Sequence, residues 1–377
     1  MCRSFPCVIR RELTAIGAQA PPHQHHHHRS FRSRAALEAL QSHIRSALAD
    51  PPQPHHLALY NYPSFSGAFA ALFAHLFHSR LRLPFLALPF SSVDSFRVED
   101  FQSQCINTCY LLDHIGPGSF ASELAQRVQR VVAFDHRKST ALRISQLGQC
   151  PENLELHIDT MKSSACAVYD HFSESLVEKN SSLLMENVEL LDSEERERVA
   201  VVVKYIENMD LLRWDLPDIE AFNIGLKDER SKLNSVVNPH VFEQLLELDS
   251  TNLIAKGKAY TGMREDAAKK LLDKAFKIRL GRGLYGECLA IRADGNSNLS
   301  HEIGVELAKR SAAAGLRPIG AVVFMQRRNL KMCLRSSNST VDTSLIAKTY
   351  GGGGTSKSSS FIIRMDEYNL WTSETSL

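Results

Sequence analysis

Short apolar runs alternate with helical stretches along the first half of the chain. We expect strands at 56–60, 85–88, 109–113 and 131–135, and helices at 68–77 and 120–128. Short strands of the buried type that alternate with helices predict a mostly parallel α/β sheet. Asp113 and Asp135 each close one of these strands at its C-terminal end, which is the edge where open α/β sheets bind ligands.

The second half of the chain predicts a helical connector and a second, smaller α/β lobe. Helical spacing of apolar residues covers 162–172 and 193–209, and the segment 228–277 is charged and helical. Further strands are expected at 288–291, 319–324, 331–336 and 360–365, and further helices at 300–314 and 341–347. We therefore expect a two-lobed α/β protein, with the larger lobe at 55–225, the connector at 226–282 and the smaller lobe at 283–377.

The composition is that of a soluble globular protein. The 377 residues are 44% hydrophobic and 23% charged, and the net charge of +2 creates no global field, so a site for a polyanion must be local. No apolar run approaches the ~18 residues that span a bilayer, and we expect no membrane partner. Cys105 and Cys109 lack a second pair at zinc spacing, so the cysteines are interpreted as reduced thiols.

The first 54 residues differ from the rest. They hold six arginines before Glu38 and a single acid, Glu12, and they are rich in Ala, Ser and Pro. We expect residues 1–54 to be disordered. Their composition resembles a mitochondrial or chloroplast transit peptide, and the alternative is a disordered N-terminus of a cytoplasmic protein. We interpret the four histidines at 25–28 as part of a natural low-complexity stretch.

Four consecutive glycines at 351–354 lie between a predicted helix and a predicted strand. Because glycine has no side chain and accepts positive φ, such a run lets backbone N–H groups close around an anion. Together with the basic strand at 331–336, it predicts a phosphate site. The alternative is a flexible Gly/Ser linker. The expected ligand-binding residues are Arg335, Gly352, Gly353, Gly354 and Thr355.

The segment DTSLIAKTYGGGGTSKSSSF resembles the C-terminal substrate-binding domain of the DHH phosphoesterase superfamily, RecJ-like or oligoribonuclease-like. In that family a GGGH motif is followed by small residues and Phe, and Thr355 stands here in place of the histidine. The resemblance covers about residues 55–371. It implies a DHH-like larger lobe and a DHH-associated smaller lobe that binds substrate.

The resemblance also implies four motifs that hold two metal ions at the ends of sheet strands. The order and spacing of the motifs are present here, but several ligands differ. Ser64 and Ser66 occupy the acidic positions before Gly67 in the first motif. Serine is a poorer ligand for Mn²⁺ or Mg²⁺ than a carboxylate.

The remaining motifs keep part of the ligand set. Asp113 is retained in the second motif, Asp135 and His136 in the third, and Asp210 or Asn208 in the fourth. Arg137 replaces the second histidine of the third motif and could neutralise the carboxylates in place of a metal. We expect at most one Mn²⁺ or Mg²⁺, or none if the site is fully degenerate. The expected metal ligands are Asp113, Asp135 and Asp210, with His136 as the catalytic residue.

Three functions remain open from the sequence. The first is a degenerate phosphoesterase that binds a phosphorylated small molecule or short oligonucleotide with little or no hydrolysis. The second is an active manganese-dependent phosphodiesterase or oligonucleotide exonuclease, which would need one metal or replacement ligands such as His55, His56 or His114. The third is a non-catalytic scaffold or interaction protein. A homodimer is left open for all three.

Overall fold

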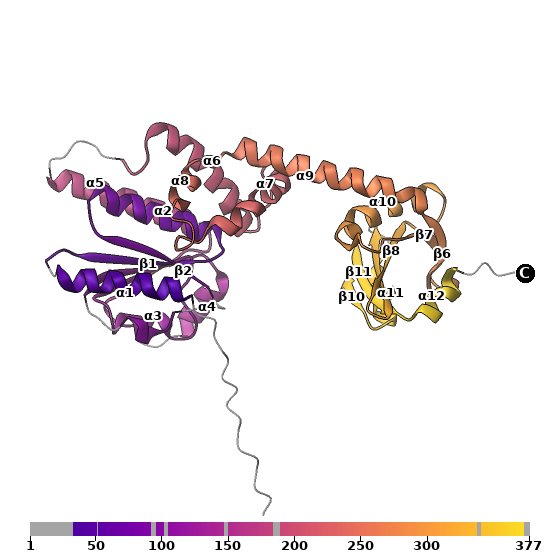
Figure 1. The fold of residues 1–377 in the computed structure, drawn as a ribbon, viewed down its shortest axis with the longest axis horizontal. Coiled ribbons are helices and arrows are strands. Elements are labelled where there is room, and N and C mark those ends of the chain that lie inside the picture. Colours follow the sequence, from indigo (N-terminus) through magenta and orange to yellow (C-terminus); the bar gives the residue numbers. More distant parts are fainter. Residues whose placement is uncertain are drawn as a thin grey trace, which may run out of the picture.

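The structure of the protein is a computed structural model that describes residues 33–50, 52–91, 96–101, 105–146, 150–183, 189–337 and 341–372. Figure 1 shows two lobes held apart along a long helix. The expected two-lobed α/β fold is confirmed.

The N-terminal lobe is built on a five-stranded parallel sheet of order β2-β1-β3-β4-β5. Its strands are β1 (His55–Asn61), β2 (Phe85–Phe90), β3 (Ile106–Leu112), β4 (Arg130–Asp135) and β5 (Leu154–Ile158). The first four match predicted strands. β5 was missed because it is an edge strand in which only Leu154 is fully buried, so its apolar signal is short.

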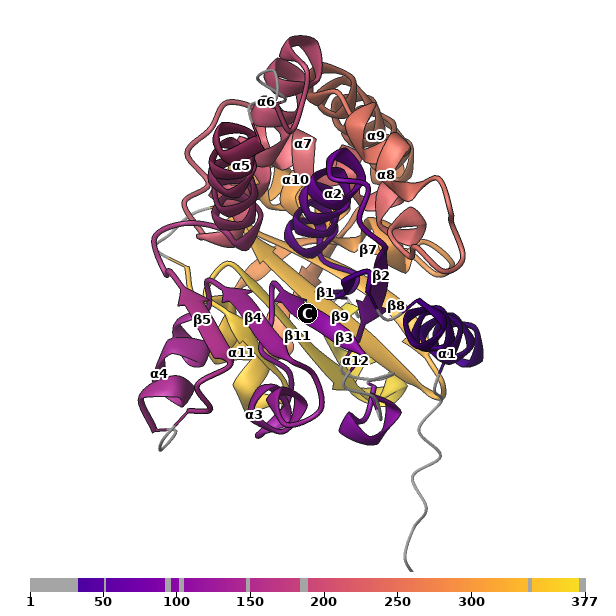
Figure 2. The same cartoon turned by 90° about the vertical axis from the view of Figure 1, so that its left-hand side faces the viewer.

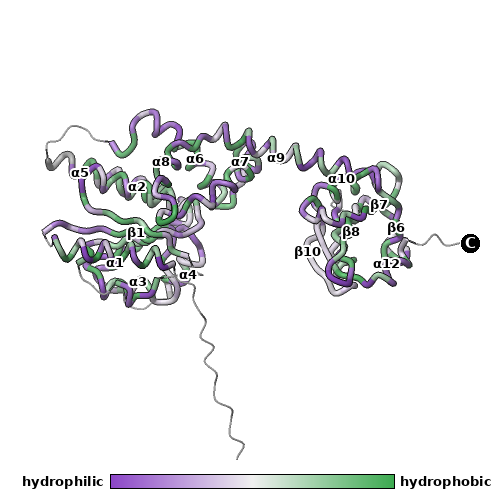
Figure 3. The backbone as a smooth tube through the Cα atoms, in the orientation of Figure 1, coloured by the Kyte–Doolittle hydropathy of each residue, from purple (hydrophilic) through white to green (hydrophobic). Residues whose placement is uncertain are grey.

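Helices cover both faces of this sheet (Figure 2). One face packs against α2 (Phe65–Arg80), α5 (Ser164–Leu183) and α6 (Ser193–Asp210). The other packs against α1 (Arg34–Ala49) and α3 (Phe120–Ala125), while α4 (Lys138–Gln146) follows β4. The sheet is therefore the middle layer of three, and its interior strand β1 is strongly hydrophobic in Figure 3. Among the described residues, no helix is both long and apolar enough to span a membrane.

Helix α1 corrects the expectation that residues 1–54 are disordered. Ser33 caps its N-terminus by accepting a hydrogen bond from the backbone N–H of Ala36. Ala36, Leu40 and Ala47 share one helical face and are buried, and Ala36 and Leu40 belong to the core on this side of the sheet. Because this apolar stripe is short and lies next to an arginine-rich segment, the helix was not predicted from the sequence. Residues 1–32, with the transit-peptide prediction and the histidines at 25–28, lie outside the described residues.

The connector consists of α7 (Ile219–Leu226), α8 (Val241–Leu246) and α9 (Ser250–Leu271). Its predicted end at 282 is wrong, because Phe276–Arg279 forms strand β6 and pairs with the C-terminal sheet. Short 3-10 turns lie at Val98–Asp100, Lys227–Lys232, Leu272–Lys274, Leu280–Gly283 and Ser297–Leu299.

The C-terminal lobe holds a six-stranded sheet of order β10-β11-β9-β8-β7-β6. Only the β7–β8 pair is parallel. The strands after β6 are β7 (Glu287–Arg292), β8 (Ile319–Gln326), β9 (Asn329–Ser336), β10 (Gly353–Thr355) and β11 (Ser358–Ile363). Helix α10 (Ser300–Ala313) packs on one face, and α11 (Thr343–Thr349) and α12 (Met365–Thr372) pack on the other.

Two glycines let α7 and α9 pack backbone to backbone. A Cβ atom at Gly225 would lie 2.0 Å from the carbonyl oxygen of Leu253, and one at Gly257 would lie 1.8 Å from that of Ala221. No side chain fits at either position without moving the helices apart. This contact fixes the start of α9 to the N-terminal lobe. The C-terminal lobe follows at the other end of α9, so the direction of this helix determines where that lobe lies.

The two glycines of α9 should respond oppositely to alanine. Gly257→Ala should lower the free energy of unfolding by about 1–3 kcal/mol, because the new methyl group has no space. Gly262→Ala, on the same helix, should leave it unchanged or raise it by up to about 1 kcal/mol, because its Cβ would meet nothing within 4 Å. Urea denaturation measures both, and equal effects would contradict the close α7–α9 packing.

Candidate functional site

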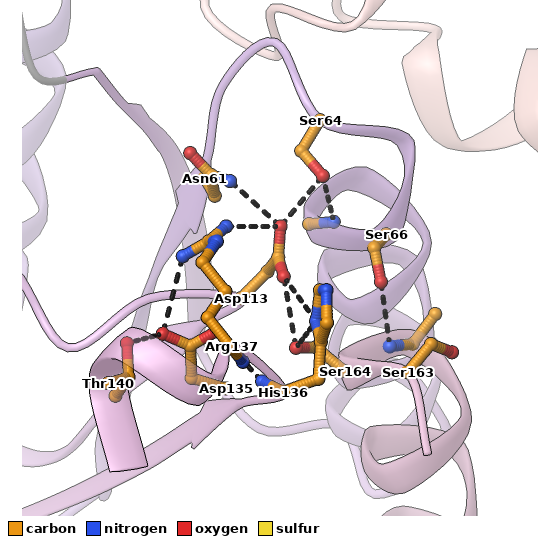
Figure 4. A network of polar contacts seen from close by, with 12 residues as sticks. Asn61, Ser64, Ser66, Asp113, Asp135, His136, Arg137, Thr140, Ser163 and Ser164 are labelled. Atoms are coloured by element: carbon orange, nitrogen blue, oxygen red, sulfur yellow. Dashed lines mark hydrogen bonds and ion pairs between the residues drawn. The ribbon is translucent and has the colours of Figure 1, made fainter. Parts of the chain in front are cut away.

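Asp113 follows β3 directly and is the centre of a polar network at the carboxyl edge of the sheet (Figure 4). It is 1% exposed and has a left-handed backbone with φ of 64°. Its Oδ2 accepts hydrogen bonds from Asn61 Nδ2 at 2.8 Å and Ser64 Oγ at 2.7 Å. Its Oδ1 accepts one from Ser164 Oγ at 3.0 Å. The carboxylate is buried but fully hydrogen-bonded.

Asp135 is the last residue of β4, the strand next to β3, so the two carboxylates are neighbours. Its Oδ2 accepts a hydrogen bond from Thr140 Oγ1 at 2.6 Å. Its Oδ1 accepts one from the backbone N–H of His136 at 2.8 Å. Thr140 and Ser164, which stand near the starts of α4 and α5, were not predicted as site residues from the sequence. Hydroxyl residues at helix starts are common caps and gave no separate signal.

Arg137 bridges the two carboxylates. Its Nη2 lies 3.3 Å from Asp113 Oδ2, and its Nη1 lies 3.3 Å from Asp135 Oδ2. Figure 4 shows the guanidinium group between the two aspartates. Since arginine stays protonated, a fixed positive charge lies where the two buried negative charges meet.

His136 lies on the other side of Asp113. Its Nδ1 is 3.2 Å from Asp113 Oδ1 and 3.0 Å from Ser164 Oγ. Burial alone would lower the pKa of His136, but the hydrogen bond to Asp113 and the nearby carboxylates raise that pKa above its usual value. Burial works against ionisation of Asp113, yet hydrogen bonds from His136, Asn61 and Ser64 and the charge of Arg137 hold its pKa at about 2.

Asp210 interacts electrostatically with Asp113 and His136 of this network. Burial, and then the charge of Asp113, raise the pKa of Asp210 to about 6. Asp210 Oδ2 is buried and has no hydrogen-bond partner among the described residues. The Asn208 amide is instead engaged by Asp215, whose carboxylate accepts from Nδ2 and whose backbone N–H donates to Oδ1.

Three of the predicted residues converge as metal-binding groups would. One ligand atom each from Asp113, Asp135 and His136 lies within 4.8 Å of the others. The surrounding positions carry the amide of Asn61 and hydroxyl groups, and Arg137 already bridges both carboxylates. This donor set does not fit two divalent ions, and one ion would have to displace the guanidinium group.

The replacement ligands considered from the sequence do not reach this site. His55 and His56 begin β1, whereas the site lies at the end of that strand. His114 Nε2 is 3.0 Å from the carbonyl oxygen of Leu59, and its Nδ1 accepts from the backbone N–H of Gly116. Both ring nitrogens of His114 are therefore engaged.

A second candidate site is a pocket of about 400 Å³ in the C-terminal lobe. It combines two cationic side chains with several hydroxyl groups and glycine backbone. Arg335 Nε is buried there without a hydrogen-bond partner among the described residues. The lining residues are Ser297, Ser300, Phe324, Lys331, Cys333, Arg335, Gly353, Gly354, Ser358, Ser359 and Ser360.

The glycine run is not one phosphate loop. Gly351 and Gly352 end helix α11, because their N–H groups donate to the carbonyls of Lys348 and Ala347 in a Schellman motif. The N–H of Gly352 is thus used within the fold, which corrects its predicted role. Gly353 and Thr355 belong to β10, and the Thr355 hydroxyl faces the carbonyl of Ser358. Only Arg335, Gly353 and Gly354 of the five predicted residues line the pocket.

Figures 1 and 2 show β10 and β11 on the side of the C-terminal lobe that faces the N-terminal lobe. Helix α9 packs against α7 at one end and α10 at the other. The lobes stay apart in this arrangement, with β10 in one lobe and β4 in the other.

Comparison with known proteins yields distant structural likenesses. No protein-family model matches the chain, and no curated protein sequence does. The chain is similar to a pGpG-specific phosphodiesterase, PggH from Vibrio cholerae, with a TM-score of 0.37 and 10% identity over 84% of this chain and 94% of that one. It is similar to CDC45 from Entamoeba histolytica, with a TM-score of 0.33 and 10% identity over 90% and 99%.

It is also similar to RecJ from Thermus thermophilus in complex with Mn²⁺, with a TM-score of 0.30 and 14% identity over 89% of this chain and 52% of that one. At these TM-scores and sequence identities the likenesses carry no argument about substrate or chemistry. That argument comes from the residues of the site.

Removing the charge of Arg137 should increase metal affinity. Wild type should bind at most one Mn²⁺ per chain, and weakly. Arg137→Gln should bind Mn²⁺ at least about tenfold more tightly than wild type. A tenfold change in affinity corresponds to roughly 1.4 kcal/mol, and the electrostatic repulsion between the guanidinium group and the ion exceeds this value. Adding Ser64→Asp should increase affinity again, since aspartate keeps the N-cap of α2 and supplies a carboxylate. Titration calorimetry measures both.

The matched control is Arg127→Gln, which removes an exposed arginine of the same lobe. Two tight Mn²⁺ sites in wild type, or equal gains in Arg127→Gln and Arg137→Gln, would show that Arg137 does not occupy the place of a metal.

Proposed function

We propose that this chain is a DHH phosphoesterase-like protein whose two-metal centre is replaced by an arginine-bridged carboxylate pair. It binds a phosphorylated small molecule or a short nucleic acid with little or no hydrolysis. The observation that carries this proposal is the guanidinium group of Arg137, which lies 3.3 Å from both Asp113 and Asp135.

The arginine bridge disfavours metal-assisted hydrolysis on electrostatic grounds. A two-metal site activates water and clamps a phosphate through the charge of its ions. Here the carboxylates that would hold such ions are neutralised by Arg137 and satisfied by hydroxyl and amide donors. His136 retains a proton-binding ring nitrogen, but an imidazole alone does not supply the charge of a divalent ion.

The C-terminal pocket supports retention of ligand binding. Lys331 and Arg335 provide two positive charges, and serine hydroxyls and the backbone of Gly353 can donate hydrogen bonds to phosphate oxygens. No carboxylate is found among its described lining residues. The buried Arg335 Nε donor without a partner is the kind of group that a bound phosphate would satisfy.

A second candidate function is a manganese-dependent phosphodiesterase with one metal. The convergence of Asp113, Asp135 and His136 favours it. In that case Arg137 would have to swing away from Asp113 when the ion binds, and hydrolysis would depend strictly on added Mn²⁺.

The test is binding and turnover of short oligonucleotides, cyclic dinucleotides and nucleoside bisphosphates, with and without Mn²⁺. Arg335→Ala should weaken binding about ten- to a hundredfold, because a charge-assisted hydrogen bond contributes roughly 1.5–3 kcal/mol. Gly353→Val should weaken it at least as much. A Cβ at Gly353 meets nothing within 4 Å, so the fold accepts valine while the side chain takes up pocket space.

Arg328→Ala is the matched control, because Arg328 is an exposed arginine of the same lobe that does not line the pocket. Binding unaffected by Arg335→Ala and Gly353→Val would favour a scaffold function. Turnover by wild type at the rates typical of enzymes, about 1–1000 per second, would overturn the proposed loss of catalysis.

A further inference from the structure

A cavity of about 660 Å³ lies at the amino edge of the N-terminal sheet, at the end opposite the Asp113 network. β3 and the start of β4 form its floor, and α2 and α5, which pack side by side over this face of the sheet, form its walls (Figure 2). Its volume falls in the range of roughly 300–1,000 Å³ that small-molecule sites occupy. None of its lining residues belongs to the Asp113 network or to the C-terminal pocket, so it is a separate candidate site.

The inner part of the cavity is aromatic. Phe77, Tyr110 and Phe172 line it, and all three side chains are more than nine-tenths buried. The ring centroid of Phe172 lies 4.8 Å from that of Phe77 and 5.2 Å from that of Tyr110. Rings in such contact favour a planar aromatic group as the occupant, because it can add further edge-to-face or offset contacts.

Polar atoms without partners interrupt this aromatic surface. The Tyr110 hydroxyl forms no hydrogen bond with the residues that the structure describes. Burial raises the pKa of Tyr110, so the hydroxyl keeps its proton at neutral pH and can donate. Two buried ring nitrogens of the cavity wall, His56 Nδ1 and His78 Nε2, also lack a partner among these residues. Because buried polar atoms are rarely left unpaired, the occupant should itself be polar at one end.

One side of the cavity mouth offers hydrogen-bond donors and a positive charge. Arg130, at the start of β4, is exposed and forms an ion pair with Glu155. Thr108 is the partner of Arg130 in the register of β3 with β4, and the charge of Arg130 also acts on Tyr110. An arginine beside two hydroxyl groups is a donor set that suits a carboxylate.

The other side of the mouth offers negative charge. Glu174 and Glu178 are exposed, lie one helical turn apart on α5, and both line the cavity. Lys179 lines it as well, so two cationic and two anionic side chains balance at the mouth. This balance favours neither a free cation nor a simple anion. It suits a small molecule that carries one charge of each sign.

We propose that this cavity binds an aromatic amino acid in its zwitterionic form. The aromatic ring packs against Phe77 and Phe172, and the carboxylate accepts hydrogen bonds from Arg130 and the Tyr110 hydroxyl. The ammonium group donates to the glutamates of α5. The proposal needs neither a phosphate nor the C-terminal pocket, so it is independent of the proposed function.

The experiment is calorimetry on the full-length chain with L-phenylalanine, L-tyrosine and L-tryptophan. Phenethylamine, which lacks the carboxylate, and phenylpropanoate, which lacks the ammonium group, are the matched probes. Each compound is titrated into wild type, Tyr110→Phe and Arg130→Gln. Tyr169→Phe is the matched control, because Tyr169 lies on α5, packs against Phe73 and does not line the cavity.

At least one of the three amino acids should bind wild type with one molecule per chain. Its affinity should fall about two- to tenfold in Tyr110→Phe and at least about tenfold in Arg130→Gln, and should be unchanged in Tyr169→Phe. Both matched probes should bind wild type more weakly. Phenethylamine should not lose affinity in Arg130→Gln, because it has no carboxylate for the guanidinium group to bind. Arg335→Ala should bind the amino acid like wild type.

Three results would overturn the proposal. They are no binding of any of the three amino acids to wild type, an affinity unchanged by Arg130→Gln, and an equal loss for phenethylamine and the amino acid in Arg130→Gln. If Tyr110→Phe does not fold, as judged by circular dichroism, the comparison of the amino acid with phenethylamine in wild type and Arg130→Gln decides.

Discussion

The pairing of Arg137 with two buried aspartates is the interaction on which the carboxyl edge of the N-terminal sheet depends. β3 and β4 are adjacent and parallel, so Asp113 and Asp135 are forced together at their ends. Two buried carboxylates repel each other and are costly to desolvate unless a positive charge and hydrogen bonds compensate. In a metalloenzyme ions provide that charge. Here Arg137 provides it, and Ser64, Thr140 and their polar neighbours satisfy the remaining lone pairs.

A second constraint is mechanical. α9 meets α7 at Gly225 and Gly257 so closely that the backbones touch, and at its other end Arg264 forms an ion pair with Glu302 of α10 at 2.6 Å. Both ends of α9 are thus fixed, one by α7 and the other by α10, while its middle is exposed. The separation between the carboxylate network and the C-terminal pocket is set by the length and direction of one helix.

Much of the fold was predictable from apolar runs, because buried parallel strands are uniformly hydrophobic and are bounded by turns. The elements at the edges of the two lobes were not predictable in this way. α1 buries only a narrow stripe, β5 is an edge strand, and β10 is three residues of glycine and threonine whose pairing depends wholly on β11. Gly352 was misassigned because a helix C-cap and an anion-binding loop use the same glycine-rich sequence.

By itself, the sequence determined which chemistry is present. It placed Asp113 and Asp135 at strand ends, Ser64 and Ser66 just before Gly67, and an arginine two residues after Asp135. Only the tertiary structure decided what these groups do. Whether Arg137 reaches both carboxylates depends on the parallel pairing of β3 with β4. That His56 and His78 meet, 22 positions apart, depends on how α2 packs across β1. Residue type is local information, but the distance between charges or lone pairs is a property of packing.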